Sequence, residues 1–330
     1  MGRLRRLIND RRVAIPLQLL ALAVLLGALG FGVRDVWPDA APRLRRADPI
    51  DLAVALLVLA GYYLLFVVGW MWILRAFGIR LAYRFALQAE MLSMLAKYIP
   101  GGVWTPAARV VALRKFGVTD TPVVLASIAL EAGLSALSGV IVLAVSLPLV
   151  GVVTGPWMLL GLFALVIAVL VHPRVFRPVA TRLLRPFGAQ EIPGLPYRTT
   201  LAILAFYGLT WPLGGAALFF LLRSVGGDPD VAAIPFLGGA SAVGAIVAVL
   251  AVFAPSGLGV REASVYGLMV AVVSDAAALG ATILNRFAIT VVEAALLGLG
   301  ALAWRLQGAP PPEPEPPRPA PVPEPDAGSA

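Results

Sequence analysis

Residues 52–74 read LAVALLVLAGYYLLFVVGWMWIL, an apolar run that contains no charged side chain. At a rise of about 1.5 Å per residue, a helix of this length crosses the roughly 30 Å hydrocarbon core of a bilayer. The whole sequence has this character: 60% of its 330 residues are hydrophobic, 13% are charged, and the mean hydropathy is +0.90. Since a soluble domain carries about a quarter charged residues, the sequence predicts an all-α polytopic membrane protein.

Further apolar runs of spanning length recur along the chain, and short polar loops separate them. They cover residues 13–33, 122–147, 156–172, 199–222, 231–253 and 277–303. We predict about eight transmembrane helices within an integral membrane domain at 13–305. A basic segment at 1–12 precedes this domain, and a proline-rich tail at 306–330, expected to be disordered, follows it.

The distribution of arginine predicts the orientation in the cytoplasmic membrane, because basic residues are enriched in cytoplasmic loops. Arginines in 1–12 precede a first apolar run that is too long for a secretory signal, so the N-terminus is expected to be cytoplasmic. The loop at 173–198 is rich in arginine and is predicted to be cytoplasmic, and the uncharged loop at 148–155 is predicted to be external. Residues 34–49 fit less well, because they are expected outside yet contain four arginines.

Composition also excludes several kinds of chemistry. The chain has no cysteine and one histidine, His172, so we expect no disulfide, no thiolate nucleophile and no multi-histidine metal site. It has no P-loop motif, so it is not expected to hydrolyse ATP. The net charge of +8 resides mainly in loops between apolar runs, so we expect no nucleic-acid partner. The bias toward arginine and alanine is typical of a high-GC bacterial genome.

Two apolar segments are too short to cross a bilayer. They are Phe85–Tyr98, which stops at Pro100-Gly101-Gly102, and Ala263–Val273, which follows Pro255-Ser-Gly-Leu-Gly259. Proline and glycine end helices, and irregular backbone at membrane depth is tolerated only where protein buries it or where it lines a wet cavity. The two segments are therefore predicted to be broken or re-entrant helices.

The two breaks also resemble each other. Residues 99–110, IPGGVWTPAARV, align without gaps on 254–265, APSGLGVREASV, and share Pro, Gly, Ala and Val. Interrupted segments at corresponding positions of two halves indicate a transporter site built from an internal repeat. We therefore predict an internal inverted repeat with a substrate site between its two breaks.

Charged side chains flank both breaks. A helix that restarts after a glycine-rich break presents free N–H groups and the positive end of its dipole, which suits an anion such as phosphate. Arginine adds bidentate contacts to phosphate. The expected headgroup-binding residues are Lys97, Pro100, Gly101, Gly102, Arg109, Pro255, Gly257, Gly259, Arg261 and Glu262.

Ionisable residues inside the spans form a second candidate set, because each is costly in a membrane unless a partner or a wet cavity compensates it. The residues expected to balance charge in a polar groove are Glu90, Glu131, Asn285, Arg286 and Glu293. Glu131 has no ionisable neighbour in sequence, so its partner is expected from another element. The alternative is that these charges pair across helices for structural reasons only.

The motifs around the breaks resemble a known family. Lys97-Tyr-Ile-Pro-Gly-Gly102 and Pro255-Ser-Gly-Leu-Gly-Val-Arg-Glu262 are similar to motifs of the lysylphosphatidylglycerol synthase transmembrane region, also described as the flippase-like domain family. Glu131 lies where that family has an intramembrane Glu-Arg segment, and Asn285-Arg286 where it has a Tyr-Arg pair. The resemblance covers residues 10–305. The chain departs from the family where Ala132 replaces arginine and Asn285 replaces tyrosine.

The resemblance implies a function in lipid handling. The best-known members continue into a cytosolic aminoacyl-transferase domain, whereas this chain ends in the proline-rich tail, which implies the translocase half alone. We therefore expect a flippase that moves an anionic phospholipid or polyprenyl-phosphate-linked headgroup between leaflets, with membrane lipids as partners, no cofactor and no enzymatic activity. The alternatives are a non-transporting membrane protein that recruits a glycosyltransferase or another envelope-lipid enzyme, and an integral transferase.

Overall fold

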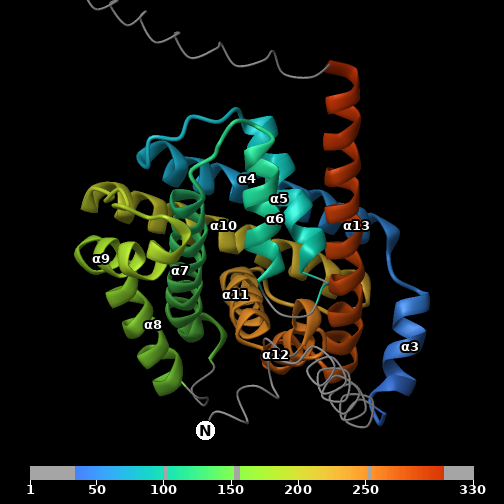
Figure 1. Cartoon of the computed structure of the whole chain (residues 1–330). Helices are drawn as coiled ribbons and strands as arrows, with labels where there is room; N and C mark the ends of the chain where they lie inside the picture. Colours follow the sequence, from blue (N-terminus) through green and yellow to red (C-terminus); the bar gives the residue numbers. More distant parts are fainter. Residues whose placement is uncertain (1–33, 98, 100–102, 152–156, 252–253, 308–330) are drawn as a thin grey trace, which may run out of the picture.

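The computed structural model describes residues 34–307 except 98, 100–102, 152–156 and 252–253 (Figure 1). The predicted first span and the proline-rich tail lie outside this part of the chain, apart from residues 306 and 307. All regular elements within it are helical. The α-helices are α3 (Trp37–Arg45), α4 (Pro49–Ala76), α5 (Tyr83–Ala96), α6 (Trp104–Arg114), α7 (Thr121–Ser146), α8 (Trp157–Val171), α9 (Pro173–Leu184), α10 (Tyr197–Ser224), α11 (Ile234–Leu250), α12 (Val260–Met269) and α13 (Asp275–Gln307). Short 3-10 turns, η1 (Leu147–Val150), η2 (Arg185–Phe187), η3 (Val231–Ala233) and η4 (Pro255–Gly257), adjoin them.

The structure confirms an all-helical architecture with several membrane-spanning helices. Five described helices are long and apolar enough to cross a bilayer: α4, α7 with η1, α10, η3 with α11, and α13. Helices α8 and α9 meet at a 76° bend. If they are counted together as one broken span, the number of candidate spans rises to six. Every apolar run predicted between 50 and 303 is therefore a helix, and its ends lie within a few residues of those predicted. The predicted number of eight spans exceeds what the described residues provide.

The described helices on either side of each predicted break form a helical hairpin. In the first hairpin α5 and α6 run antiparallel, with the ring of Phe85 stacked on that of Phe116 at 4.6 Å between centroids and Glu90 paired with Arg109 (Figure 1). In the second, α11 and α12 run antiparallel: Gly257 before α12 lies against Ala248, with an added Cβ 2.2 Å from that of Ala248, whereas Val265, farther along α12, lies against Gly244, one turn earlier on α11. Although α11 is long enough to cross a bilayer, the chain thus turns back after it.

The backbone of the second tip explains why the helix breaks there. Ser256, Gly257 and Gly259 all have positive φ angles, of 54°, 63° and 86°. Glycine adopts such angles freely, whereas a residue with a side chain does so at a cost. This left-handed stretch follows Pro255 in η4 and reverses the chain direction between α11 and α12.

The two hairpins enter the bundle from opposite ends. One end, which we call the α9 end, is held by a buried cluster of Ile73 in the last turn of α4, Phe77 just after α4, Val123 at the start of α7, Ala180 on α9 and Ile192. The first hairpin starts and finishes there, after α4 and before α7. At the other end, the α3 end, the N–H of residue 48 donates to the carbonyl of residue 224 at 2.8 Å. The second hairpin starts and finishes at the α3 end, after α10 and before α13.

Small residues allow the central helices to approach closely. A Cβ added to Gly215 of α10 would lie 2.1 Å from the carbonyl oxygen of Ile234, and one added to Gly238 of α11 would lie 2.5 Å from that of Trp211. A Cβ on Gly239 would lie 2.6 Å from the Cα of Leu143 on α7. Small residues at such contacts are typical of helix packing in membranes, where close van der Waals contact stabilises association. The second hairpin therefore packs closely against α7 and α10 through α11.

The close contact at Gly215 predicts a stability effect. Gly215→Ala places a methyl group against the backbone of α11, so we expect a loss of about 1–3 kcal/mol from overpacking and a lower melting temperature in detergent. Gly208→Ala on the same helix is the matched control, because nothing lies within 4 Å of a Cβ there. The control should be neutral or gain up to about 1 kcal/mol from helix propensity. Equal melting temperatures for the two variants would contradict this account of the packing.

Candidate functional site

The most deeply buried charges lie between the first hairpin and α7. Arg109 on α6 forms ion pairs with Glu90 on α5 and with Glu131 on α7. The three residues are only 4%, 1% and 4% exposed. A buried guanidinium is costly unless carboxylates compensate it, so this arrangement fixes the hairpin against α7. The partner expected for Glu131 from another element is thus Arg109.

Aromatic residues complete the surroundings of Arg109. Its guanidinium carbon lies 4.4 Å from the ring centroid of Trp70 on α4, within the range of a cation–π interaction. The indole N–H of Trp70 donates to the hydroxyl of Ser127 on α7 at 3.0 Å. Trp70 is fully buried, so it supports Arg109 from one side and is itself oriented by α7.

Tyr207 of α10 reaches the same cluster. Its hydroxyl donates to Oε1 of Glu131 at 3.4 Å, and its side chain is fully buried. Gly69 of α4 makes this possible, because a Cβ at Gly69 would lie 2.6 Å from the Tyr207 hydroxyl. The cluster is therefore held by five helices, α4, α5, α6, α7 and α10.

A second charged pair lies at the tip of the first hairpin. Lys97 forms an ion pair with Glu293 of α13, and the hydroxyl of Tyr63 on α4 donates to Oε1 of the same carboxylate at 2.8 Å. Glu293 is 4% exposed and the Lys97 side chain is 17% exposed. The tip is thereby attached to α13.

A third pair lies at the tip of the second hairpin. Arg286 of α13 lies 3.3 Å from Oε1 of Glu262 on α12 and 3.5 Å from the carbonyl oxygen of Ser256. The other carboxylate oxygen of Glu262 accepts from the N–H of Gly259 at 2.6 Å. We expected this start of a helix to be free for an anion, but the side chain of Glu262 already caps it. Since Arg286 and Glu293 lie two turns apart on one helix, α13 holds both tips.

Arg261 differs from the other charged residues of these three groups. It forms no ion pair with any residue that the structure describes, and its Nε atom is buried without a hydrogen-bond partner. Its side chain packs against α11, where a Cβ added to Gly244 would lie 3.4 Å from the Cγ of Arg261. Its charge interacts electrostatically with Lys97 of the other hairpin and with Tyr62 of α4. Arg261 is thus a partly buried cation, close to both tips and without a counterion in the described chain.

The structure brings together most residues of the two candidate sets. Glu90, Lys97, Arg109, Glu131 and Glu293 take part in the interior ion pairs, as do Glu262 and Arg286. Asn285 is buried beside Arg286, and its side chain has no hydrogen bond to the described residues. Pro100, Gly101 and Gly102 lie outside the described residues, and for Pro255 only the backbone is described.

Three aromatic residues of the site were not predicted from the sequence: Tyr63, Trp70 and Tyr207. Each lies in an apolar run where an aromatic residue is ordinary, so no local signal distinguishes it. Within the described part of the chain, no group of acidic or histidine side chains could hold a metal ion. Among the described cations of these three groups, Arg261 has no carboxylate partner, and a guanidinium in that state can form charge-assisted hydrogen bonds to an anion.

Comparison with known proteins identifies the family of this chain. The sequence model of the family described as the lysylphosphatidylglycerol synthase TM region matches residues 15–298, which is most of the chain. No curated protein matches the sequence. The chain belongs to the family of the lysylphosphatidylglycerol synthase transmembrane region, a membrane domain related to lipid handling.

Proposed function

We propose that this protein moves an anionic lipid headgroup, of a phospholipid or a polyprenyl phosphate, between the leaflets of the cytoplasmic membrane. Membership of the family supports a role in lipid handling. The observation that carries the proposal is Arg261, a cation without a described counterion beside the tips of both hairpins. In this proposal the headgroup phosphate binds at Arg261, while the lipid chains remain in the bilayer.

The neighbours of Arg261 favour an anion over a neutral solute. Lys97 and Arg286 lie near enough for their charges to interact with each other, and Lys97 also interacts with Arg261. A phosphate at Arg261 would reduce the repulsion among these cations and would satisfy the buried Nε atom. Glu262 and Glu293 compensate Arg286 and Lys97 when no headgroup is bound.

The arrangement of the hairpins supports the inverted repeat that the sequence suggests. The α5–α6 hairpin enters from the α9 end and the α11–α12 hairpin from the α3 end, as two halves of opposite topology would. In this interpretation the hairpin tips form the site between the halves, and movement of one half against the other exposes it to each leaflet in turn.

Charge distribution supports an orientation with the α9 end in the cytoplasm. Basic residues predominate there: Arg75, Arg80, Arg84, Arg114, Lys115, Arg174, Arg177, Arg182, Arg185 and Arg198, against Asp120 and Glu191. At the α3 end, acidic residues balance the basic ones. The basic residues are Arg34, Arg43, Arg45, Arg46 and Arg223, and the acidic residues are Asp35, Asp39, Asp48, Asp51, Asp228, Asp230 and Asp275. The arginines at 34–49 are thus compatible with an external location, because the other residues at that end neutralise them.

Arg261→Gln tests the proposed headgroup site. We expect at least a tenfold slower transfer of headgroup-labelled phosphatidylglycerol or polyprenyl phosphate in vesicles containing the purified protein, because a charge-assisted contact is lost. Leaflet exposure would be followed with a membrane-impermeant quencher. The substitution leaves no described carboxylate without its partner, so the fold should be retained.

Arg223→Gln is the control for that experiment, because Arg223 is a half-exposed arginine near the α3 end, paired with Asp51 at 3.4 Å. It should transfer lipid at the rate of the unmodified protein. Equal rates for Arg261→Gln and the unmodified protein would rule out the site. No transfer by the unmodified, folded protein with any anionic lipid would rule out translocation and favour recruitment of an envelope-lipid enzyme.

Substitutions in the Arg109 cluster test whether its ion pairs stabilise the fold only or also take part in lipid transfer. Arg109→Met leaves two buried carboxylates facing each other, so we expect a loss of about 3–5 kcal/mol and a lower melting temperature in detergent. Combining it with Glu90→Gln and Glu131→Gln removes these charges and should restore most of the stability. A triple variant that is stable but inactive would show that the cluster functions in transfer. One that is stable and fully active would assign the cluster a structural role only.

A further inference from the structure

Helix α9 turns away from the helix that precedes it. The axes of α8 and α9 meet at 76°, and the junction lies at His172 and Pro173. His172 caps the start of α9, because its Nδ1 accepts from the N–H of Arg174 at 3.3 Å, and Pro173 occupies the first helical turn. Both residues favour the start of a new helix at this position. Helix α8 packs against the spanning helix α7, where a Cβ at Gly133 would lie 2.5 Å from a methyl carbon of Val171. Since α9 is nearly perpendicular to α8, its axis runs along the membrane surface.

The exposed surface of α9 has two faces of opposite character. Val179, Leu183 and Phe187 follow one another at intervals of four residues and are 38%, 69% and 59% exposed. They form an apolar stripe that the described chain leaves uncovered. Arginines at 174, 177 and 185 lie on the other side of α9 and of the turn η2 that continues it, and Arg182 lies at the border of the stripe. An apolar stripe opposite a row of arginines is the pattern of a helix that lies in the interface between lipid chains and headgroups.

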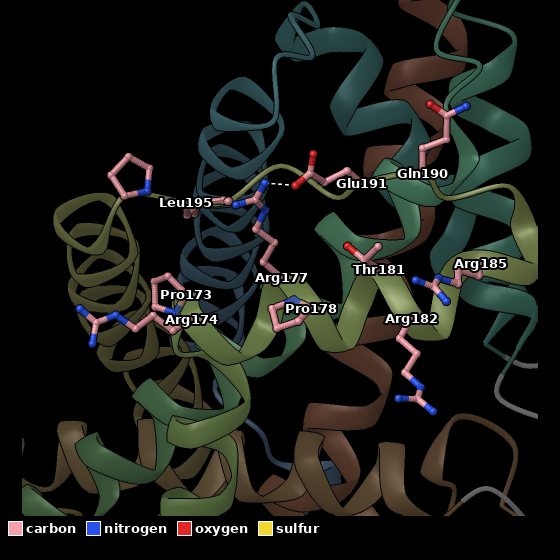
Figure 2. Close-up of a pocket in the computed structure, with 12 residues that line it drawn as sticks. Pro173, Arg174, Arg177, Pro178, Thr181, Arg182, Arg185, Gln190, Glu191 and Leu195 are labelled. Atoms are coloured by element: carbon pink, nitrogen blue, oxygen red, sulfur yellow. Dashed lines mark hydrogen bonds and ion pairs between the residues drawn. The ribbon is translucent and has the colours of Figure 1, made fainter.

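A pocket of about 780 Å³ lies on the basic face, between α9 and the segment 190–196 (Figure 2). The segment is held in place because the N–H of Ile192 donates to the hydroxyl of Thr181 at 3.1 Å, and because Ile192 and Leu195 are buried. Arg174, Arg177, Arg182 and Arg185 line this open pocket. Figure 2 shows Arg177 reaching Glu191, whereas Arg182 projects from the side of α9 that faces away from the segment 190–196.

The charge of this pocket is largely uncompensated. Arg177 pairs with Glu191, whereas Arg174, Arg182 and Arg185 form no ion pair with the described residues. Planar guanidinium groups bind phosphate oxygens in pairs, so several of them around one pocket suit a phosphate group. The apolar stripe on the same helix places this pocket at the depth of the lipid headgroups rather than in bulk water.

We propose that this pocket binds the phosphate of an anionic phospholipid in the leaflet that faces the α9 end. The site lies at the membrane surface and shares no residue with the interior charges around Arg261. It is therefore independent of the proposed translocation, because a lipid can be held there whether or not the protein moves it. Val179, Leu183 and Phe187 contact the acyl chains, and the arginines contact the headgroup.

The test compares binding of dioleoyl phosphatidylglycerol to the full-length protein in detergent micelles, measured by native mass spectrometry over a lipid titration. The unmodified protein should retain phosphatidylglycerol in preference to phosphatidylcholine. Arg182→Gln combined with Arg185→Gln should weaken phosphatidylglycerol binding by about tenfold or more, since each basic residue near a membrane surface contributes to attraction of anionic lipid.

Arg45→Gln combined with Arg46→Gln is the matched control, because it removes two exposed arginines at the α3 end. This control should leave binding unchanged. An equal loss in both double variants, or a loss in neither, would overturn the site. Melting temperatures of both variants should equal that of the unmodified protein, because none of the four arginines forms an ion pair in the described chain.

A second comparison distinguishes a lipid from a soluble phosphate. Leu183→Asn disrupts the apolar stripe and should weaken binding of phosphatidylglycerol while leaving all arginines in place. Competition by glycerol 3-phosphate should require far higher concentrations than competition by the lipid. If glycerol 3-phosphate competes as well as phosphatidylglycerol and Leu183→Asn has no effect, the pocket binds a soluble anion and the lipid assignment is wrong.

Discussion

The structure depends on the compensation of charge inside an apolar bundle. Arg109 is almost fully buried, and in such surroundings an uncompensated guanidinium would cost several kcal/mol. Glu90 and Glu131 remove that cost only if α5, α6 and α7 keep one arrangement. Since Trp70 and Tyr207 orient the cluster from α4 and α10, the position of the first hairpin is coupled to that of most of the central bundle.

The second hairpin also depends on compensation of polar groups inside the bundle, but here the groups are backbone atoms at its tip. Its irregular tip lies within the bundle, where backbone groups need partners, and α13 supplies one through the contact of Arg286 with the carbonyl of Ser256. The first tip reaches the same helix through Lys97 and Glu293. A displacement of α13 would therefore disturb both tips together, which makes this helix the element that couples them.

Much of the fold could be predicted from sequence because it depends on local patterns. Apolar runs locate the helices, and proline with glycine locates both breaks. Partners across the bundle could not be predicted in this way: nothing near Glu131 in sequence points to Arg109 or Tyr207, since those contacts arise only when the hairpin packs. The segment after Pro255 was predicted to be broken or re-entrant, but sequence could not decide between crossing and returning, because the length and composition of α11 equal those of a true span. The apolar stripe of α9 was hidden among arginines that indicated only a cytoplasmic loop.

The interior charges are unevenly distributed, and this unevenness has a functional consequence. Around Arg109 two carboxylates face one guanidinium, whereas around the second tip two arginines, Arg261 and Arg286, face the single carboxylate of Glu262. The apolar bundle would be most stable with each group neutral. In the proposed function, the positive charge that Arg261 leaves at the second tip is the charge that an anionic headgroup would compensate. A neutral lipid would not compensate it, so this local imbalance supports an anionic substrate.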